Sequence, residues 1–508
     1  MGSNTRYEDD NTTNGVLLDV EIMLSLKLIQ KLILKEVNMF AHKIRRLLCL
    51  VVPSLIVILL AMPTSAQWPG TWVSSIQVMN LGTATANVVV EYYREDGTRI
   101  DSATHSYTIT VGSSLNIYQP NVPGLPEGFK GSAVVSADQP IAAIGSQQTF
   151  YADGSIGNSQ YSGFNAQAVG NKFYLPNVNK KFGGSQWSSR ITIQNVTANL
   201  VTATITFYNA DGTVRDTDTV NLPGNGSATL TQINDSELPD GWLGAAVVEA
   251  TGDVAVIVDV MSADGRLETY NGFTSGSTKM YLPTLLINFG ANQWNSSFQV
   301  FNVGNVSAVV TMTYYTSGVA TPAKVVTTTL PPYQSINRYQ PTADSDLGAP
   351  WIGSVVIEST QPIVAVGSQS SGAPGKRLAS IYNGVASGAT QAFLPTILRY
   401  FGGSNFVTSF QIMNVGSEPA SVTVEYFAPG NPTPVMTVRY DGTPGNEPKI
   451  APYTSVNRYQ GHDTALGSGW QGSVRVTSDQ PVVVLGSQVG LNRTGDAAGQ
   501  YNGIVATP

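Results

Sequence analysis

The chain contains very few residues that could support thiol, redox or metal chemistry. It has one cysteine, Cys49, and three histidines in 508 residues. Cys49 lies in an N-terminal segment that we predict to be removed, so disulfides and thiol nucleophiles are excluded for the mature chain. The other two histidines beyond this segment, His105 and His462, belong to no recurring motif, which argues against a zinc site. Nucleophile-elbow, phosphate-loop and dinucleotide motifs are also absent. We therefore predict a protein that is not an enzyme and that needs no cofactor or metal.

Charged residues and long apolar runs are also scarce. Only 12% of the residues are charged. Residues 1–66 hold seven basic and six acidic side chains, so 20 basic and 28 acidic side chains remain beyond them. This acidic excess argues against nucleic acid or an anionic membrane as a partner. No apolar run of ~18 residues follows residue 66, so no transmembrane segment is predicted in the mature chain.

The N-terminal region has the pattern of an export signal. Lys43, Arg45 and Arg46 precede the apolar run Leu47–Leu60, and Thr64-Ser65-Ala66 is a small-residue cleavage site. We predict a signal peptide over 39–66, cleavage near Ala66, and an extracellular protein that is secreted or held at the cell surface. Because Met39 stands where such a signal normally starts, residues 1–38 are interpreted as a mis-called start or an extension.

A segment of 22 residues occurs four times beyond this region. The copies align without a gap, and their shared asparagines are separated by 115, 107 and 112 residues. A period of this length indicates one domain per repeat. We predict repeat 1 over 67–170, repeat 2 over 171–277, repeat 3 over 278–389 and repeat 4 over 390–508. The copies are Trp72–Tyr93, Trp187–Tyr208, Trp294–Tyr315 and Phe406–Phe427.

The pattern within each repeat is that of β-strands. Apolar residues alternate with polar ones, and turn signals such as Asp96-Gly97-Thr98 separate the runs. We predict an all-β protein made of four tandem antiparallel β-sandwich (immunoglobulin-like) domains of about 110 residues after the signal peptide. Short, similar joints containing Leu-Pro stand at the start of repeats 2, 3 and 4, which predicts a fixed geometry between neighbours and either a semi-rigid rod or a compact chain of four beads. Repeat 1 lacks such a lead-in because the signal peptide stands there.

Several aromatic and asparagine positions recur across the repeats. We predict that the aromatic residues are plugs of the core or of the joints, with stacking on sugar rings as the alternative. The asparagines are predicted to bond the backbone in turns, with glycan attachment at Asn-x-Ser/Thr triplets such as the one at Asn195 as the alternative. The repeat-defining residues are Trp72, Trp187, Trp294 and Phe406 at one position, Trp242, Trp351 and Trp470 at a second, and Asn80, Asn195, Asn302 and Asn414 at a third.

Two acidic groups are weaker candidates for a site. Repeat 2 contains Asp240, Glu249, Asp253, Asp259 and Asp264, and Asp259 replaces a serine found at Ser146, Ser368 and Ser487. A convergent acid/base or calcium site is one interpretation, and a solvent face that has diverged is the favoured one. Asp344-Ser-Asp346 lacks the spacing of a complete calcium loop.

The patterns W-x-S-x-[IF]-x-[VI]-x-N and G-S-x-V…Q-P-[IV] give the chain a family resemblance. It resembles secreted bacterial proteins built from tandem immunoglobulin-like domains, of the adhesin and surface-layer kind. The resemblance implies a fold and a location and carries over no active site.

Two hypotheses for function follow. The first is a non-enzymatic extracellular structural or adhesive protein, which would bind itself or other cell-surface proteins and assemble into a filament or layer through edge strands. The terminal repeats would supply these strands, because a segment of a neighbouring molecule could fill the gap expected in repeat 1. The alternative is a secreted carbohydrate-binding protein that binds glycans with aromatic and amide side chains.

Overall fold

A computed structural model describes residues 55–60, 69–165 and 167–505, with the backbone alone for 55–60. The predicted all-β class is confirmed, since the described residues form antiparallel sheets connected by turns. Their helical segments are the four-residue helix α2 (Gln340–Ala343) and short 3-10 turns. No helix in the described ranges has the length and apolar character needed to cross a membrane. Ser54–Pro508 forms one compact unit, which is the unit considered below.

Repeats 2, 3 and 4 are each built around one long strand that belongs to two layers. In repeat 2 the first half of β14 (Trp242–Met261) pairs with β9 (Gly170–Lys180) and β11 (Val201–Asn209). Its second half pairs with β10 (Ser188–Asn195) and β15 (Leu267–Asn271). β12 (Val214–Leu222) and β13 (Ser227–Thr231) extend the two layers. Each layer therefore has four strands, and the long strand joins the layers.

Repeats 3 and 4 have the same order of strands. Repeat 3 consists of β16 (Ser277–Ile287), β17 (Trp294–Asn302), β18 (Ala308–Thr316), β19 (Pro322–Leu330), β20 (Ser335–Tyr339), the long β21 (Trp351–Ser371) and β22 (Ala379–Asn383). Repeat 4 consists of β23 (Ala389–Arg399), β24 (Phe406–Asn414), β25 (Val422–Phe427), β26 (Met436–Tyr440), β27 (Ser455–Tyr459), the long β28 (Trp470–Gly490) and β29 (Ala498–Asn502).

Repeat 1 has two separate sheets in place of one sheet with a shared strand. Their orders are β1-β6-β3-β4 and β5-β2-β7-β8, and β6 and β7 correspond to the two halves of the long strand. The strands are β1 (Leu55–Leu60), β2 (Thr71–Asn80), β3 (Ala86–Arg94), β4 (His105–Ile109), β5 (Ser114–Tyr118), β6 (Gly131–Ala137), β7 (Ile141–Phe150) and β8 (Ile156–Ser162).

The expected gap in repeat 1 is not present. β1 pairs antiparallel with β6, from Leu55 opposite Ser136 to Leu60 opposite Gly131, which is where β9, β16 and β23 pair in the other repeats. An apolar run of this length suits a buried strand as well as a signal peptide, and the sequence pattern alone does not separate the two. The rest of the predicted signal peptide, its cleavage site and residues 1–38 lie outside the described residues.

The core of each repeat lies between its two layers. In repeat 3, Phe298 and Val300 on β17 face Met312 and Tyr314 on β18, and all four side chains are fully buried. Burying one such side chain contributes about 1.5–3 kcal/mol, which explains why the alternating positions of the repeated segment are apolar.

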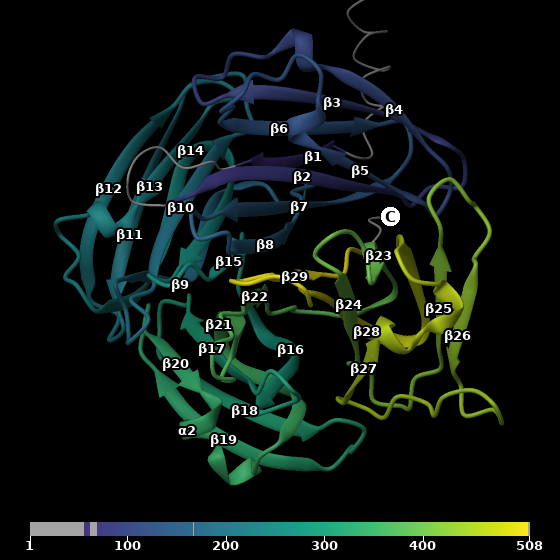
Figure 1. The fold of residues 1–508 in the computed structure, drawn as a ribbon. Coiled ribbons are helices and arrows are strands. Elements are labelled where there is room, and N and C mark those ends of the chain that lie inside the picture. Colours follow the sequence, from purple (N-terminus) through teal and green to yellow (C-terminus); the bar gives the residue numbers. More distant parts are fainter. Residues whose placement is uncertain (1–54, 61–68, 166, 506–508) are drawn as a thin grey trace, which may run out of the picture. The chain divides into compact units, whose positions relative to one another are not determined.

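The expectation of a rod is wrong, because repeats 1 and 4 are in direct contact. The last strands of the repeats, β8, β15, β22 and β29, lie against one another, and β29 returns to β8 (Figure 1). Polar groups near the ends of these strands form a cycle of hydrogen bonds. The side-chain Nδ2 of each asparagine donates to the backbone carbonyl of the preceding repeat: Asn271 donates to Ser162 O (2.8 Å), Asn383 donates to Asn271 O (2.6 Å) and Asn502 donates to Asn383 O (2.8 Å). Ser162 Oγ closes the cycle by donating to Asn502 O (3.3 Å). The residue between Tyr and Gly at the end of each repeat therefore links it to a neighbour.

A buried carboxylate in repeat 4 adds a second link among the repeats. Asp496 is fully buried and accepts hydrogen bonds from the backbone N–H groups of Leu267 (2.8 Å), Ala379 (3.0 Å) and Ala498 (3.1 Å). Its own N–H donates to Ile156 O (2.6 Å). One residue thus contacts repeats 1, 2 and 3. This role was not predicted, because Asp496 lies in a loop without a recurring motif.

Candidate binding clefts between the repeats

The recurring asparagines lie in turns of the backbone. Asn80, Asn195, Asn302 and Asn414 are fully buried. In each, Nδ2 donates to backbone carbonyls, as Asn302 does to Val306 O and Leu330 O, both at 2.9 Å. Asn195 Nδ2 already donates to three carbonyl groups, so this buried amide is not open to glycan attachment.

The recurring aromatic residues fall into two groups by exposure. Trp72, Trp242 and Trp351 are buried, and the indole Nε1 of Trp351 donates to Thr316 Oγ1 (3.0 Å). The others are half-buried, namely Trp187, Trp294, Trp470 and Phe406. Burial of the first group fits a packing role, whereas half-buried rings keep a surface that a ligand can contact.

The acidic residues of repeat 2 do not converge. Asp240 forms an exposed ion pair with Lys181 (2.9 Å), Glu249 pairs with Lys172 (2.9 Å) and Asp264 pairs with Arg266 (2.9 Å). Asp253 stands on the middle of the long strand, and Asp259 is buried elsewhere. An acid/base pair or calcium site built from this group is therefore not formed.

Asp259 has a structural partner at the interface between repeats 1 and 2. Its Oδ2 accepts bonds from Nε (3.0 Å) and Nη2 (2.7 Å) of Arg190, and both side chains are at most 1% exposed. Gln147 of repeat 1 donates to Asp259 Oδ1 (3.1 Å). The Arg190 guanidinium lies 5.1 Å from the ring centre of Trp72, also in repeat 1. The replacement of serine by Asp259 thus accompanies a buried ion pair at this interface.

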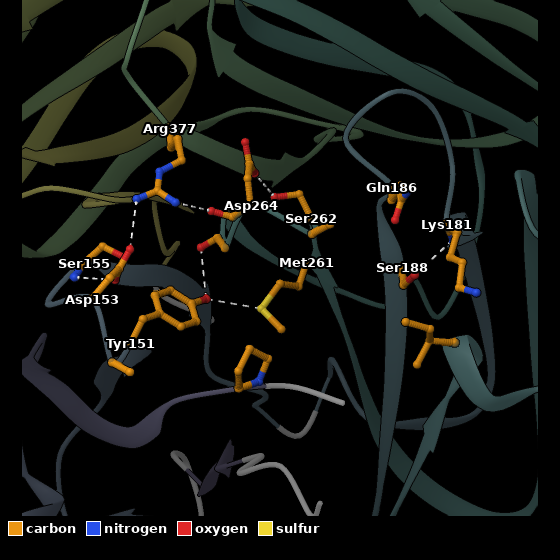
Figure 2. A pocket seen from close by; sticks show the side chains of 15 residues that line it. Tyr151, Asp153, Ser155, Lys181, Gln186, Ser188, Met261, Ser262, Asp264 and Arg377 are labelled. Carbon is orange, nitrogen blue, oxygen red and sulfur yellow. Dashed lines mark hydrogen bonds and ion pairs between the residues drawn. The ribbon is translucent and has the colours of Figure 1, made fainter. Parts of the chain in front are cut away.

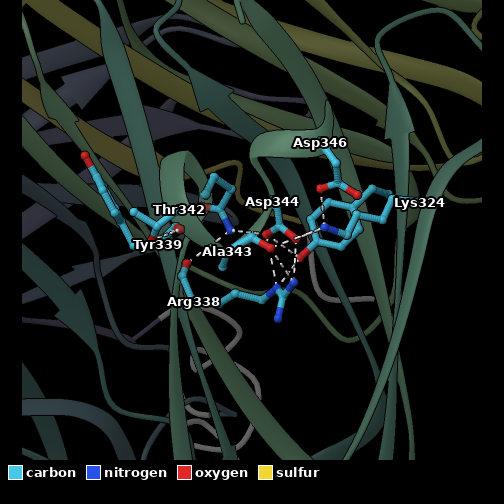
Figure 3. Close-up of polar contacts among 9 residues, drawn as sticks. Lys324, Arg338, Tyr339, Thr342, Ala343, Asp344 and Asp346 are labelled. Carbon is cyan, nitrogen blue, oxygen red and sulfur yellow. Dashed lines mark hydrogen bonds and ion pairs between the residues drawn. The ribbon is translucent and has the colours of Figure 1, made fainter. Parts of the chain in front are cut away.

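Asp344 and Asp346 are also used for ion pairs (Figure 3). Asp344 is fully buried, and Arg338, Lys324 and Tyr314 donate to its carboxylate. Burial opposes ionisation of Asp344, but hydrogen bonds from Arg338 and Lys324 outweigh it and lower the pKa. A carboxylate with two cationic partners lacks the free ligand atoms that calcium requires.

A further acidic cluster was not anticipated from the sequence. Asp216 and Asp218 alternate along β12 and lie close to Asp235 of the following loop. Burial raises the pKa of Asp218, with further contributions from Asp235 and Asp216. Alternation along one strand could have signalled the first pair, but the third member comes from tertiary folding.

A charged pocket lies where repeats 1, 2 and 3 approach one another (Figure 2). Its volume is about 480 Å³. Arg377 donates to Asp264 O (3.0 Å) and lies 3.6 Å from Asp153, while Tyr151 OH donates to Gly265 O (3.0 Å). These groups are largely satisfied by one another, so the pocket holds a network that ties the repeats together.

A polar cleft lies between repeats 2 and 3, with a volume of about 480 Å³. The wall from repeat 2 includes half-buried Trp187, and the wall from repeat 3 includes Gln299 and Tyr339. Tyr339 is 41% exposed, and Gln299 donates to Asn337 Oδ1 (3.1 Å). The cleft thus combines aromatic rings with amide groups, and its size is that of a small-molecule site.

One acidic residue lies in this cleft. Glu268 is 3% exposed, and Ser368 of repeat 3 donates to its carboxylate. Burial raises the pKa of Glu268 to about 7, although the bond from Ser368 acts in the opposite direction. No second carboxylate lines the described wall, so Glu268 lacks the partner that a two-carboxylate hydrolytic site needs.

No protein-family model matches the chain, and no curated protein is similar to it. Solved structures show only weak likeness, as three of them illustrate. Thermotoga maritima 1070 is 20% identical with a TM-score of 0.19, covering 22% of this chain and 94% of its own. The Anabaena sensory rhodopsin transducer is 15% identical with a TM-score of 0.15, covering 17% and 92%. A tetra-tandem repeat from the extending region of a large adhesion protein is 12% identical with a TM-score of 0.10, covering 89% and 99%. None of these likenesses assigns a family or a function.

Proposed function

We propose that this protein is a non-enzymatic structural or adhesive protein of the cell exterior, in which the four repeats act as one preassembled unit. The carrying observation is the cycle of hydrogen bonds among Ser162, Asn271, Asn383 and Asn502, which joins each repeat to the next and the fourth to the first. Such a unit presents the surfaces of all four repeats in fixed positions.

The use of three buried carboxylates supports the non-enzymatic part of the proposal. Asp259 and Asp344 are bound by arginine or lysine, and Asp496 is bound by backbone N–H groups. An acid/base catalyst must be able to exchange a proton with a bound substrate, and these arrangements leave the carboxylates engaged in the fold.

Negative-stain microscopy and light scattering of the exported chain, at low and high concentration, test the structural role. Filaments, sheets or attachment to a cell surface are the expected result. A protein that stays monomeric at high concentration and binds no surface would overturn the proposal.

Carbohydrate binding is the second candidate, and the cleft between repeats 2 and 3 favours it. Its exposed Tyr339 offers a ring face beside half-buried Trp187, over which the Arg266 guanidinium lies at 5.0 Å from the ring centre. Gln299 and Asn337 offer amide groups. Ring faces pack against the C–H faces of sugars, while amides both donate to and accept from hydroxyl groups. A glycan array probed with the fluorescently labelled full chain tests this candidate, and the absence of any bound glycan would refute it.

A further inference from the structure

Two of the interfaces between repeats contain a cleft built from the same repeat positions. The cleft between repeats 4 and 1 has a volume of about 160 Å³. Phe406 of repeat 4 takes the place that Trp187 takes between repeats 2 and 3. On the opposite wall, Gln77 and Tyr118 of repeat 1 correspond to Gln299 and Tyr339 of repeat 3.

The second wall of both clefts follows a polar pattern in the sequence. Repeats 1, 3 and 4 have Ser, Gln, Asn and Tyr at four equivalent strand positions, whereas repeat 2 has a different residue at each of the four. The four shared positions are Ser75, Ser297 and Ser409; Gln77, Gln299 and Gln411; Asn116, Asn337 and Asn457; and Tyr118, Tyr339 and Tyr459. Repeat 2 has Arg190, Thr192, Thr229 and Thr231 there.

The departure in repeat 2 fills the corresponding space between repeats 1 and 2. Arg190 stands where Ser297 stands in repeat 3, and its guanidinium lies over Trp72, the equivalent of Trp187. Asp259 holds it there with two hydrogen bonds. Arg190 is fully buried, whereas Ser75 and Ser297 are half-buried and line open clefts. The same position is thus filled by a buried ion pair at one interface, whereas at two others a serine stands there and lines a cleft.

The open clefts are suited to a neutral ligand that is rich in hydroxyl groups. The lining of the cleft between repeats 4 and 1 contains no charged side chain in the described ranges, and Glu268 is the one charged residue lining the other. The exposed tyrosines, Tyr118 at 38% and Tyr339 at 41%, supply ring faces. In addition, buried Oε1 atoms of Gln160 and Gln299 accept no hydrogen bond from the described part of the chain, although buried acceptors are normally satisfied.

We propose that the clefts between repeats 2 and 3 and between repeats 4 and 1 are a pair of binding sites for neutral oligosaccharides, and that the Arg190–Asp259 ion pair closes the equivalent site between repeats 1 and 2. The proposal rests on the carbohydrate-binding candidate described above and adds the location of two sites and the class of sugar.

The test is calorimetric titration of the full chain with a panel of neutral gluco- and manno-oligosaccharides, with oligogalacturonate as a charged counterpart. Tyr339→Ala removes an exposed ring from the first cleft. The double variant Ser75→Arg, Ser146→Asp transfers the ion pair of repeat 2 into the second cleft. Leu200→Ala is the matched control, because this exposed apolar residue lies on a loop that lines neither cleft.

We expect both of these clefts to bind a neutral oligosaccharide in the wild-type chain and neither to bind oligogalacturonate. Each cleft variant should weaken one site by about tenfold or more, equivalent to about 1.4 kcal/mol, and leave the other unchanged. The combined variant should show both sites weakened, and Leu200→Ala should bind like wild type. Circular dichroism and the thermal midpoint check that each variant is folded.

Two results would overturn the inference and are distinguishable from each other. Neutral oligosaccharide binding that is as tight in the folded combined variant as in wild type would place the sugar site elsewhere and leave the carbohydrate-binding candidate standing. Failure of every neutral oligosaccharide of the panel to bind the wild-type chain would refute the inference at both clefts, and an empty glycan array would then refute the carbohydrate-binding candidate as well. The structural role is decided separately by the assembly experiments.

Discussion

Replacing Asp259 by serine should destabilise repeat 2 strongly, although serine is the residue that the other three repeats carry there. The change removes the acceptor of two bonds from Arg190 and leaves a guanidinium that is 1% exposed without its counter-ion. Removing one partner of a buried ion pair costs about 3–5 kcal/mol, because the remaining charge is desolvated without compensation. The hydrogen bond from Gln147 to Asp259 Oδ1 is lost at the same time, because its acceptor is removed.

The double variant Arg190→Ser, Asp259→Ser should recover most of this loss. It recreates the serine pair found as Ser75 with Ser146 and as Ser297 with Ser368. No buried charge then remains, so we expect a coupling energy of about 2 kcal/mol or more between the two positions.

Urea unfolding followed by tryptophan fluorescence measures these free energies. Trp72 lies against Arg190, so its emission also reports the local change. The reasoning is refuted if Asp259→Ser costs less than about 1 kcal/mol, or if the double variant is as unstable as the single one, since neither result is compatible with an uncompensated buried charge.

Three other perturbations are expected to have measurable effects. Burial raises the pKa of Glu268 from its ordinary 4.5 to about 7, so between these pH values the folded protein holds a proton that the unfolded chain has lost, and the free energy of unfolding should fall as pH rises from about 4.5 to 7. Glu268→Gln should remove this pH-dependent part of the stability, worth on the order of 3 kcal/mol. Urea titrations in which the variant keeps the pH dependence of the wild type would contradict the prediction. Asn383→Ala removes the donor to Asn271 O and the acceptor of Asn271 N–H, so we expect the free energy of unfolding to fall by about 1–3 kcal/mol. The control is Asn337→Ala, which changes an exposed asparagine and should lower the free energy of unfolding by less. A chain that starts at Gln67 lacks β1, so the backbone amides of β6 should exchange hydrogen faster than in a chain that retains Leu55–Leu60. The exchange rates of the amides of β14, which pairs with β9, should be the same in both chains.

The sequence was most informative about what happens inside one repeat. Alternating residues such as Phe298 and Val300 predicted strands correctly, because side chains on one face of a strand share one environment. The turn at Asp96-Gly97-Thr98 was also found, and Gly97 adopts a φ of 83° that suits glycine.

The relations among repeats could not be predicted in the same way. Similar joints indicated a fixed geometry, but they contain nothing that distinguishes an open row from a closed cycle. The cycle depends on Asn271, Asn383 and Asn502, which meet in space although they are more than a hundred residues apart in the chain. The acidic residues of repeat 2 were similarly ambiguous, because the decisive partner of Asp259 is Arg190, which lies on a different strand.

The head-to-tail bonding among the repeats has a consequence for how the interfaces can diverge. Four identical subunits joined by the same contact would change all four interfaces with every mutation, because symmetry copies each substitution. A single chain is free of that constraint. The Arg190–Asp259 pair occupies one interface, while serines stand at the matching positions of repeats 1, 3 and 4. Covalent fusion of the repeats thus lets one protein carry interfaces with different chemistry, so that one can be specialised for rigidity while others keep their openings.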